Sequence, residues 1–250
     1  PNALGQPTRA GAFATDVRYF PNGAMARFTY GNGVVHTLQQ NARGMPERSR
    51  DAGVEAVLDD SDDYDGNGNV AAISDGLLGS RGNRDMQYDG LDRLTATTSP
   101  MFDTARYRYD VLDNLRAVQI AGRDHAYHYD ARNRLTNVQQ AEGGATVIGL
   151  KYDAQGNLAT KNGQSYRFDM GNRLREAVDQ ERYRYDGHGR RIQADHPALG
   201  SITSMYGQDG VLRTQHNTRQ ARSIDYVLLN GSQVAQVEGM IVPAAPTLTL

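Results

Sequence analysis

From Tyr88 the chain reads Tyr-Asp-Gly-Leu-Asp-Arg-Leu, and this seven-residue pattern recurs along most of the sequence. From Tyr109 it reads Tyr-Asp-Val-Leu-Asp-Asn-Leu, and from Tyr129 it reads Tyr-Asp-Ala-Arg-Asn-Arg-Leu. Eight copies begin, at steps of 16 to 24 residues, at Tyr64, Tyr88, Tyr109, Tyr129, Tyr152, Phe168, Tyr185 and Tyr206. Self-similarity at so short a period is typical of repeat architectures.

Each position of the pattern has a physical reason. The second residue is aspartate in seven copies, and a carboxylate at the start of a tight turn can accept backbone N–H groups two residues on. The fifth is Gly, Asn or Asp, the residues that tolerate positive φ. These aspartates are Asp65, Asp89, Asp110, Asp130, Asp153, Asp169 and Asp186. The seventh, apolar residue starts the returning strand, as in Val70, Leu94, Leu115, Leu135, Leu158, Leu174 and Leu212.

The unit is therefore a strand, a tight turn and a returning strand. A lone hairpin is marginal in water, so each unit must stack on its neighbours. The segments between units are rich in Gly, Asn, Ser and Thr and are predicted to form the turns at the opposite edge. No stretch has a helical period. The predicted fold is all-β, built from stacked antiparallel β-hairpin repeats.

The N-terminal part carries degenerate copies. Residues 19–25 keep the aromatic, the glycine and the closing apolar residue, whereas residues 40–46 keep the turn without the aromatic. The predicted organisation is degenerate repeats over 1–63, clear repeats over 64–215, a terminal hairpin over 216–239 and a Pro-rich linker to a further domain over 240–250. Because the chain begins with Pro1, we expect it to be part of a longer protein.

Composition narrows the classes of function. Net charge is −2, which gives no electrostatic case for nucleic acid or an anionic membrane. Cysteine is absent, which excludes disulfides and thiolate zinc sites. No apolar run is long enough to span a bilayer. Fourteen tyrosines against five phenylalanines and no tryptophan indicate thin, partly solvated sheet.

One segment suggests a metal site. Asp63, Asp65 and Asn67 copy the first half of a calcium-binding EF-hand loop. The twelfth position would be Ser74, where a bidentate glutamate is needed, and no flanking helix is predicted. The sequence is explained better as one more repeat, which begins at Tyr64 and follows an acidic loop. We therefore expect no metal and no cofactor.

No catalytic motif accompanies the repeats. The Gly-x-Ser-x-Gly elbow and the Gly-x-x-x-x-Gly-Lys phosphate loop are absent. A glycosidase pair among the many carboxylates stays open, because it is defined by distance in space. We expect no enzymatic activity. The sixth-position arginines are predicted to form a ladder with aspartates of neighbouring units: Arg93, Arg134, Arg173 and Arg190. Rows of exposed tyrosine and arginine binding carbohydrate or protein are the alternative.

The pattern aromatic-Asp-x-x-[Gly/Asn/Asp]-[Arg/Asn]-Leu resembles the tyrosine-aspartate (YD, or RHS) repeat of bacterial Rhs proteins, Tc-toxin shell subunits and animal teneurins. The resemblance covers nearly the whole chain. It implies a strip of β-hairpins that spirals into a hollow shell, of which this chain would be a partial wall. In many bacterial members of the family the shell encloses a C-terminal toxin. The Asp-Pro-rich core motif of some members is absent here, since the chain holds no Asp-Pro dipeptide.

Two hypotheses follow from the resemblance. In the first, the chain is a structural shell segment of a large exported bacterial protein that encloses or presents a C-terminal toxin. Its partners would be further repeats and the cargo of the same polypeptide, and a secretion-system component. In the second, it is a cell-surface adhesion or carbohydrate-binding module with a glycan as partner. Both place the protein outside the cell or at its surface.

Overall fold

The fold was analysed in a computed structural model, which describes residues 1–241. The described residues form 22 β-strands and one short 3₁₀ helix. They divide into two compact units, unit 1 with residues 1–149 and unit 2 with the described residues from 150 on. The predicted linker over 240–250 lies, from residue 242 on, outside the described residues.

Unit 1 holds the first 12 strands and most of the thirteenth. They are β1 (Ala14–Tyr19), β2 (Met25–Tyr30), β3 (Val35–Gln40), β4 (Pro46–Ala52), β5 (Ala56–Tyr64), β6 (Val70–Asp75), β7 (Arg84–Tyr88), β8 (Leu94–Ser99), β9 (Asp103–Tyr109), β10 (Leu115–Ile120), β11 (Arg123–Tyr129), β12 (Leu135–Gln140) and β13 (Thr146–Tyr152). The 3₁₀ helix η1 (Gly79–Arg81) lies between β6 and β7.

Unit 2 takes up the end of β13 and the strands that follow it. They are β14 (Leu158–Lys161), β15 (Gln164–Phe168), β16 (Leu174–Ala177), β17 (Glu181–Tyr185), β18 (Arg191–His196), β19 (Gly200–Tyr206), β20 (Leu212–Asn217), β21 (Arg222–Leu229) and β22 (Ser232–Met240). The hairpin expected over 216–239 corresponds to β21 and β22, which pair over eight residues on each strand.

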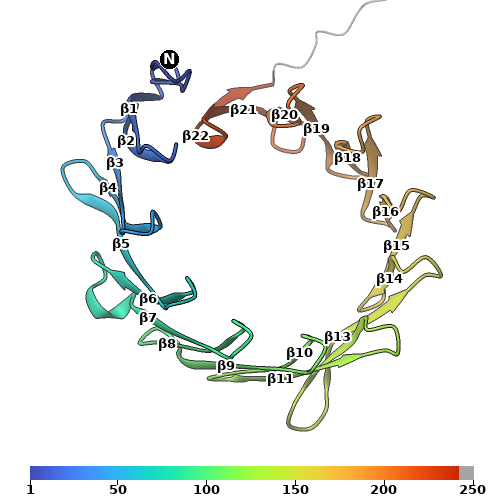
Figure 1. The fold of residues 1–250 in the computed structure, drawn as a ribbon. Coiled ribbons are helices and arrows are strands. Elements are labelled where there is room, and N and C mark those ends of the chain that lie inside the picture. The colour runs from blue at the N-terminus through green and yellow to red at the C-terminus, as the bar shows by residue number, and fades with distance from the viewer. Residues whose placement is uncertain (242–250) are drawn as a thin grey trace, which may run out of the picture. The chain divides into compact units, whose positions relative to one another are not determined.

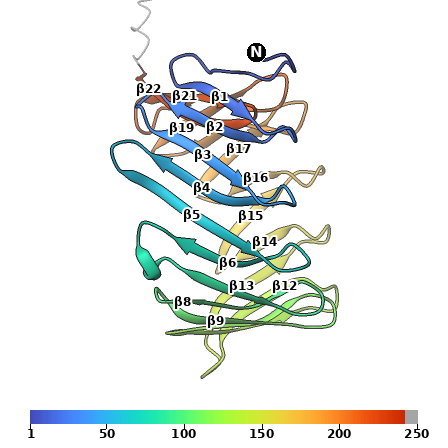
Figure 2. The same ribbon diagram turned by 60° about the vertical axis from the view of Figure 1, so that its left-hand side comes forward.

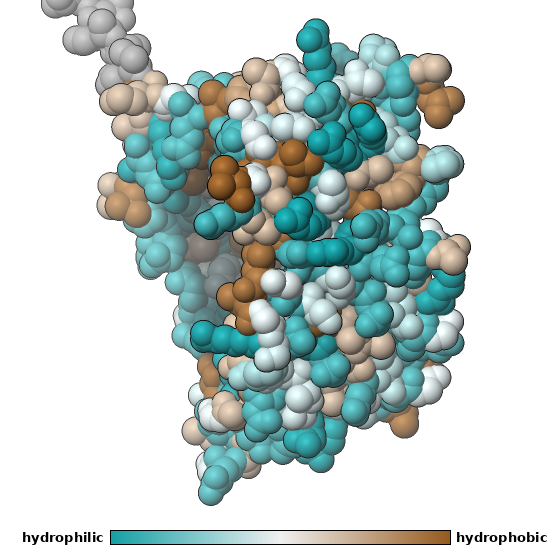
Figure 3. All heavy atoms as spheres, turned by 90° about the vertical axis from the view of Figure 1, so that its left-hand side faces the viewer, coloured by the Kyte–Doolittle hydropathy of each residue, from teal (hydrophilic) through white to brown (hydrophobic). Residues whose placement is uncertain are grey.

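Each strand from β2 to β21 pairs antiparallel with the strand before it and the strand after it in sequence, as β8 does with β7 and β9. Figures 1 and 2 show this meander within each unit, with neighbouring strands joined by short hairpin connections at alternate edges. The all-β fold of stacked antiparallel hairpins is therefore confirmed. Most residues of the sheet are partly or fully exposed, and the side of the molecule seen in Figure 3 is largely hydrophilic with scattered hydrophobic side chains.

The buried core is thin and built largely from small residues. Ala105 and Ala117 in unit 1, and Ala177 and Ala194 in unit 2, are at most 8% exposed. Larger buried side chains are few, and Val138 and Leu229 are the most enclosed of the apolar ones, at 2% and 1%. A single sheet has no second layer to cover its faces, so side chains are covered mainly by neighbours on the same face.

Bulges fix the register of each repeat. Where a tyrosine ends a strand, the pairing skips one residue on the returning strand, as between Tyr109↔Leu115 and Arg108↔Ala117. The same shift occurs at Tyr88, Tyr129 and Tyr185. The fifth-position residue has positive φ, for example 59° at Asp92 and 63° at Asn133, which confirms the predicted left-handed turn position. An αL residue after a type I turn is the usual three-residue hairpin with a G1-type bulge.

Candidate functional site: the turn edge and the tyrosine ladder

The repeat aspartate organises its own turn. In the turn from Asp89 to Arg93, Asp89 Oδ1 accepts the backbone N–H groups of Leu91 at 2.9 Å and Arg93 at 3.1 Å. The first is the bond predicted for this position. Asp89 Oδ2 accepts Nε of Arg93 at 2.8 Å, so both carboxylate oxygens are used inside one turn. The edge of the sheet formed by these turns is called the turn edge below.

The sixth residue completes the turn in two chemical versions. Arginine donates to its own aspartate in the repeats that begin at Tyr88, Tyr129, Phe168 and Tyr185. Asparagine donates instead in the repeats that begin at Tyr64, Tyr109 and Tyr152, as Asn114 Nδ2 does to Asp110 Oδ2 at 3.0 Å. The side-chain bond from Arg93 lowers the pKa of Asp89, and the bond from Asn114 lowers the pKa of Asp110.

The prediction that the sixth-position arginines pair with aspartates of neighbouring repeats was wrong for their main ion pair. Each pairs with the aspartate four residues earlier in its own turn, at 2.7 Å for Arg93–Asp89 and Arg134–Asp130. Local geometry explains this, because the bulge brings the sixth residue back over the carboxylate that caps the turn. Arg93 has enough donors to reach the next repeat as well, and contacts Asp113 Oδ1 at 2.7 Å.

Neighbouring turns are tied to each other along the turn edge. Arg93 donates to the backbone oxygen of Asp110 at 3.0 Å, and Arg190 donates to that of Gly207 at 3.1 Å. In the asparagine version, Asn69 Nδ2 reaches Asp92 Oδ1 of the next repeat at 2.9 Å, and Asn157 Nδ2 reaches Asn172 Oδ1 at 3.0 Å. The sixth residue therefore caps its own turn and links that turn to the following one.

The first-position tyrosines form a second set of links, the tyrosine ladder. Five of these hydroxyls donate to the backbone oxygen of the seventh residue of the preceding repeat. The bonds are Tyr88 to Val70 at 2.9 Å, Tyr109 to Leu94 at 3.0 Å, Tyr129 to Leu115 at 3.0 Å, Tyr185 to Leu174 at 2.8 Å and Tyr206 to Arg191 at 3.0 Å. Burial raises the pKa of Tyr88 and Tyr109 above the usual value for tyrosine.

Arginine also packs on these rings. The guanidinium of Arg93 lies 5.0 Å from the centre of the Tyr109 ring, and that of Arg190 lies 5.3 Å from the centre of the Tyr206 ring. Such contacts are worth about 0.5–1 kcal/mol at exposed sites. Phe168 is the exception among the first-position residues, because it has no hydroxyl to donate to the repeat before it.

The weak repeats use a different cap. Where the second residue is neither aspartate nor asparagine, an Asn or Asp at the fourth position accepts the backbone N–H of the sixth: Asn22 from Ala24, Asn32 from Val34 and Asp209 from Val211, each at 3.1 Å. The sequence analysis missed the middle turn. There the aromatic Tyr30 occupies the second position and not the first, so the motif is shifted by one residue.

The structure gives the calcium candidate another role. Asp65 Oδ1 accepts the backbone N–H groups of Asn67, Gly68 and Asn69, each at 2.9 Å. Asp63 lies on β5 opposite Ala72 and takes no part in this turn. Within residues 1–241, no three His, Asp or Glu side chains are grouped so that they could hold a metal ion. The Asp65 carboxylate thus caps its turn in the same way as the second-position aspartates of the other repeats.

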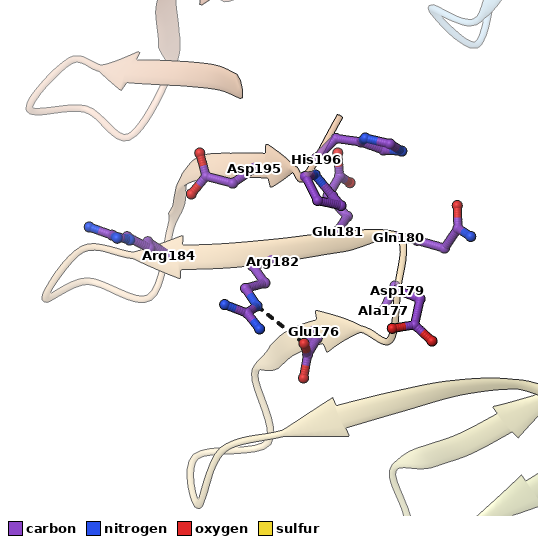
Figure 4. Close-up of a pocket in the computed structure, with 10 residues that line it drawn as sticks. Glu176, Ala177, Asp179, Gln180, Glu181, Arg182, Arg184, Asp195 and His196 are labelled. Carbon is purple, nitrogen blue, oxygen red and sulfur yellow. Dashed lines mark hydrogen bonds and ion pairs between the residues drawn. The ribbon is translucent and has the colours of Figure 1, made fainter. Parts of the chain in front are cut away.

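Unit 2 contains a polar cavity of about 420 Å³ beside β16, β17 and β18. Figure 4 shows Arg182 and Glu176 pointing toward each other at its lining, where Arg182 Nε and Glu176 Oε1 form an ion pair at 3.2 Å. Arg167 holds the other oxygen of Glu176 at 3.0 Å, and Glu181 is paired with Arg219. His196 Nδ1 accepts the backbone N–H groups of Ala198 and Leu199, each at 3.1 Å. These polar side chains of the cavity are therefore held in ion pairs and hydrogen bonds that stabilise the fold.

Beside this cavity, burial and the neighbouring Glu181 raise the pKa of Tyr183 to about 12.

No helix in the described part of the chain is long and apolar enough to cross a bilayer.

An unbroken antiparallel meander whose repeats are coupled by tyrosine hydroxyls and turn-edge side chains is the architecture of a repeat shell. The sequence of residues 46–215 matches the teneurin YD-shell family. The chain therefore belongs to the YD-shell family, as the repeat motif indicated.

Solved structures agree at the level of fold. The chain is similar to the crystal structure of TcdB2-TccC3-Cdc42, with a TM-score of 0.63 and 13% identity over 86% of this chain and 14% of that chain. It is also similar to the Photorhabdus luminescens Tc holotoxin pore, with a TM-score of 0.64 and 14% identity over 91% of this chain and 14% of that chain. The chain thus spans about a seventh of these larger proteins. No curated protein sequence matches it.

Proposed function

We propose that the chain is one wall segment of an exported repeat shell that encloses a toxin or other effector carried by the same polypeptide. The YD-shell family match and the fold shared with a Tc-toxin component support the shell role. The observation that carries the proposal is the coupling between repeats. Ladder hydroxyls and turn-edge side chains join successive hairpins at two separate places, which suits a continuous barrier.

The proposal is structural and includes no catalytic step. Further repeats of the same polypeptide and the cargo would be the partners of the wall, and export would place the shell outside the producing cell. A carbohydrate-binding role for the tyrosine rows is less well supported, because the hydroxyls of Tyr88, Tyr109 and Tyr129 are already bound to backbone oxygens.

Limited proteolysis with mass spectrometry of the full-length protein that carries these repeats tests the proposal. Two substitutions provide a matched pair: Val138→Asp places a charge at a site that is 2% exposed, and Val111→Asp places the same charge on a turn tip that is 97% exposed. We expect a segment outside the repeats to resist protease in the native protein and in Val111→Asp, and to be cleaved in Val138→Asp. Cleavage of every segment outside the repeats in the native protein would contradict enclosure.

A further inference from the structure

Three arginines lie in a row on one face of the first strands of unit 1. The strand registers place Arg18 opposite Arg27, Arg27 opposite Thr37, Thr37 opposite Arg50, and Arg50 opposite Asp59. Directly paired residues of antiparallel strands point to the same side of the sheet. These five residues are called the arginine row, and Figure 2 shows the strands that carry it, β1 to β5, side by side.

Only one end of the row is neutralised. Asp59 accepts two hydrogen bonds from Arg48, at 2.7 and 2.8 Å, and lies 3.5 Å from Arg50 Nε. The bond from Arg48 lowers the pKa of Asp59, so this carboxylate is ionised and shared by two arginines. Arg48 and Arg50 remain 43% and 44% exposed. Asp59 therefore has no capacity left for the other end of the row.

The other end holds two facing cations without a counter-ion. Among the described residues, neither Arg18 nor Arg27 forms an ion pair, although the exposed Asp16 lies in the same strand. Paired residues on neighbouring strands are about 4.5–5.5 Å apart at Cα, and like charges placed directly opposite each other are destabilising. The fold does not need this arrangement, because the equivalent pairs Arg108↔Ala117 and Gln87↔Ala96, which also directly precede a first-position tyrosine, do not place two cations opposite each other.

The neighbours of the row are hydroxyl and amide groups. Thr15 pairs with Thr29 beside the facing arginines, and Thr37 and Gln39 follow on β3. The aromatic residues of β2, Phe28 and Tyr30, alternate with Arg27 and Thr29 and so lie on the opposite face. The face of the row thus offers forked cation donors and hydroxylic partners, and no ring on which a nucleic-acid base could stack.

We propose that the arginine row binds an acidic polysaccharide. Its carboxylate or sulfate groups would lie between Arg18 and Arg27 and over Arg50, and its hydroxyls would meet Thr29, Thr37 and Gln39. Arginine is suited to this ligand because its planar fork holds a carboxylate or sulfate in two hydrogen bonds. Bound anions would also remove the repulsion between the two facing cations. The site is independent of any cargo that the shell encloses.

Calorimetry tests the proposal by measuring how tightly the 250-residue chain binds polygalacturonate and heparin. Neutral dextran and phosphatidylserine vesicles serve as further probes. Arg18→Gln/Arg27→Gln removes the unpaired cations, and Arg106→Gln/Arg108→Gln removes two exposed cations from β9 with the same change in net charge. We expect the first variant to lose at least about tenfold in affinity for one acidic polymer and the second less than about twofold, because only the first removes charged hydrogen-bond donors of the arginine row.

If the two variants lose the same affinity, binding depends only on the net charge of the protein, and the proposed site is wrong. Absence of binding to both acidic polymers, or binding to the vesicles that exceeds it, would overturn the polysaccharide assignment. Thermal unfolding without ligand controls for misfolding: Arg18→Gln/Arg27→Gln should unfold no earlier than the parent, because it removes a repulsion. Arg18→Lys/Arg27→Lys keeps both charges and loses the fork, so its affinity should fall between those of the parent and the Gln variant.

Discussion

The repeats of β9 to β12 and those of β14 to β17 carry the same motif and differ in how firmly they are joined. The first group has strands of six or seven residues, and the tyrosine ladder runs through it by way of Tyr109 and Tyr129. The second has strands of four or five residues. There β14 and β15 share two register pairs, where the corresponding strands β10 and β11 share four, and Phe168 interrupts the ladder.

This difference teaches that the motif fixes the turn, whereas strand length and the first-position hydroxyl set the strength of the joint. In a repeat protein, stability is approximately a sum of repeat terms and nearest-neighbour interface terms. We therefore expect β14 to β17 to be the first region of the described chain to open. The predictions below break or sharpen this contrast.

The largest effect is expected from a charge buried in the firmly joined repeats. Val138 on β12 lies between Tyr127 and Ile148 and is 2% exposed. Val138→Asp should lower the free energy of unfolding by more than about 3 kcal/mol, because it leaves an unpaired charge in an apolar site. Hydrogen exchange should then show early opening of β11 to β13, with the protection of β21 and β22 kept.

Val111→Asp, at a turn tip that is 97% exposed, is the control and should change stability by no more than about 0.5 kcal/mol. If Val138→Asp instead unfolds both units together, the repeats are globally cooperative and the nearest-neighbour description fails. If it changes neither stability nor exchange, the core assigned to this face is wrong.

The sequence predicted the turns better than the joints between them. Turn chemistry is local, so Asp130 and Asn133 could be assigned a carboxylate cap and a positive φ from their spacing alone. The partners of the tyrosine hydroxyls were not predicted, because the bond from Tyr109 to the backbone oxygen of Leu94 depends on strand register. The aromatic residue at the first position predicted packing within the sheet, and did not indicate which atom accepts the hydrogen bond of its hydroxyl.

Two other misses have local causes. The arginine–aspartate pairs fall within a turn and not between turns because the bulge returns the sixth residue to the cap, as in Arg134–Asp130. The facing pair Arg18↔Arg27 was invisible in the sequence, since β1 is itself bulged and its register cannot be read from alternation. Sites formed by side chains on different strands therefore required the structure.

A smaller, distributed effect is expected from acid. Side-chain and backbone hydrogen bonds lower the pKa of the repeat aspartates, including Asp130 and Asp153, below the value of about 3.9 in the unfolded chain. Between the folded and unfolded values the unfolded state binds more protons, so this stabilisation is present above about pH 4 and is lost as the pH falls through the folded values. Urea unfolding from about pH 5 to about pH 3 should show decreasing stability.

Asp153→Asn should make that decrease shallower, because the amide keeps an acceptor for the turn and removes one titrating group.

The pKa of Asp62 is shifted in the opposite direction. Burial and the neighbouring Asp60 and Asp63 raise its pKa, so its ionised form is a cost that protonation relieves. Asp62→Asn should therefore stabilise the protein at neutral pH. A stability that stays constant or rises on acidification would show that the turn carboxylates do not contribute as described.

The smallest effect isolates a single hydroxyl in each region. Tyr109→Phe removes the bond to Leu94 and should cost about 1 kcal/mol, while Tyr107→Phe, whose hydroxyl has no hydrogen-bond partner in the described chain, should stay within about 0.5 kcal/mol. The reverse change, Phe168→Tyr, places a hydroxyl where the ladder would meet the backbone oxygen of Leu158. It should stabilise by up to about 1 kcal/mol and raise protection in β14 to β17. If Phe168→Tyr gains nothing while Tyr109→Phe loses stability, short strands and not the missing hydroxyl make this region the weaker one.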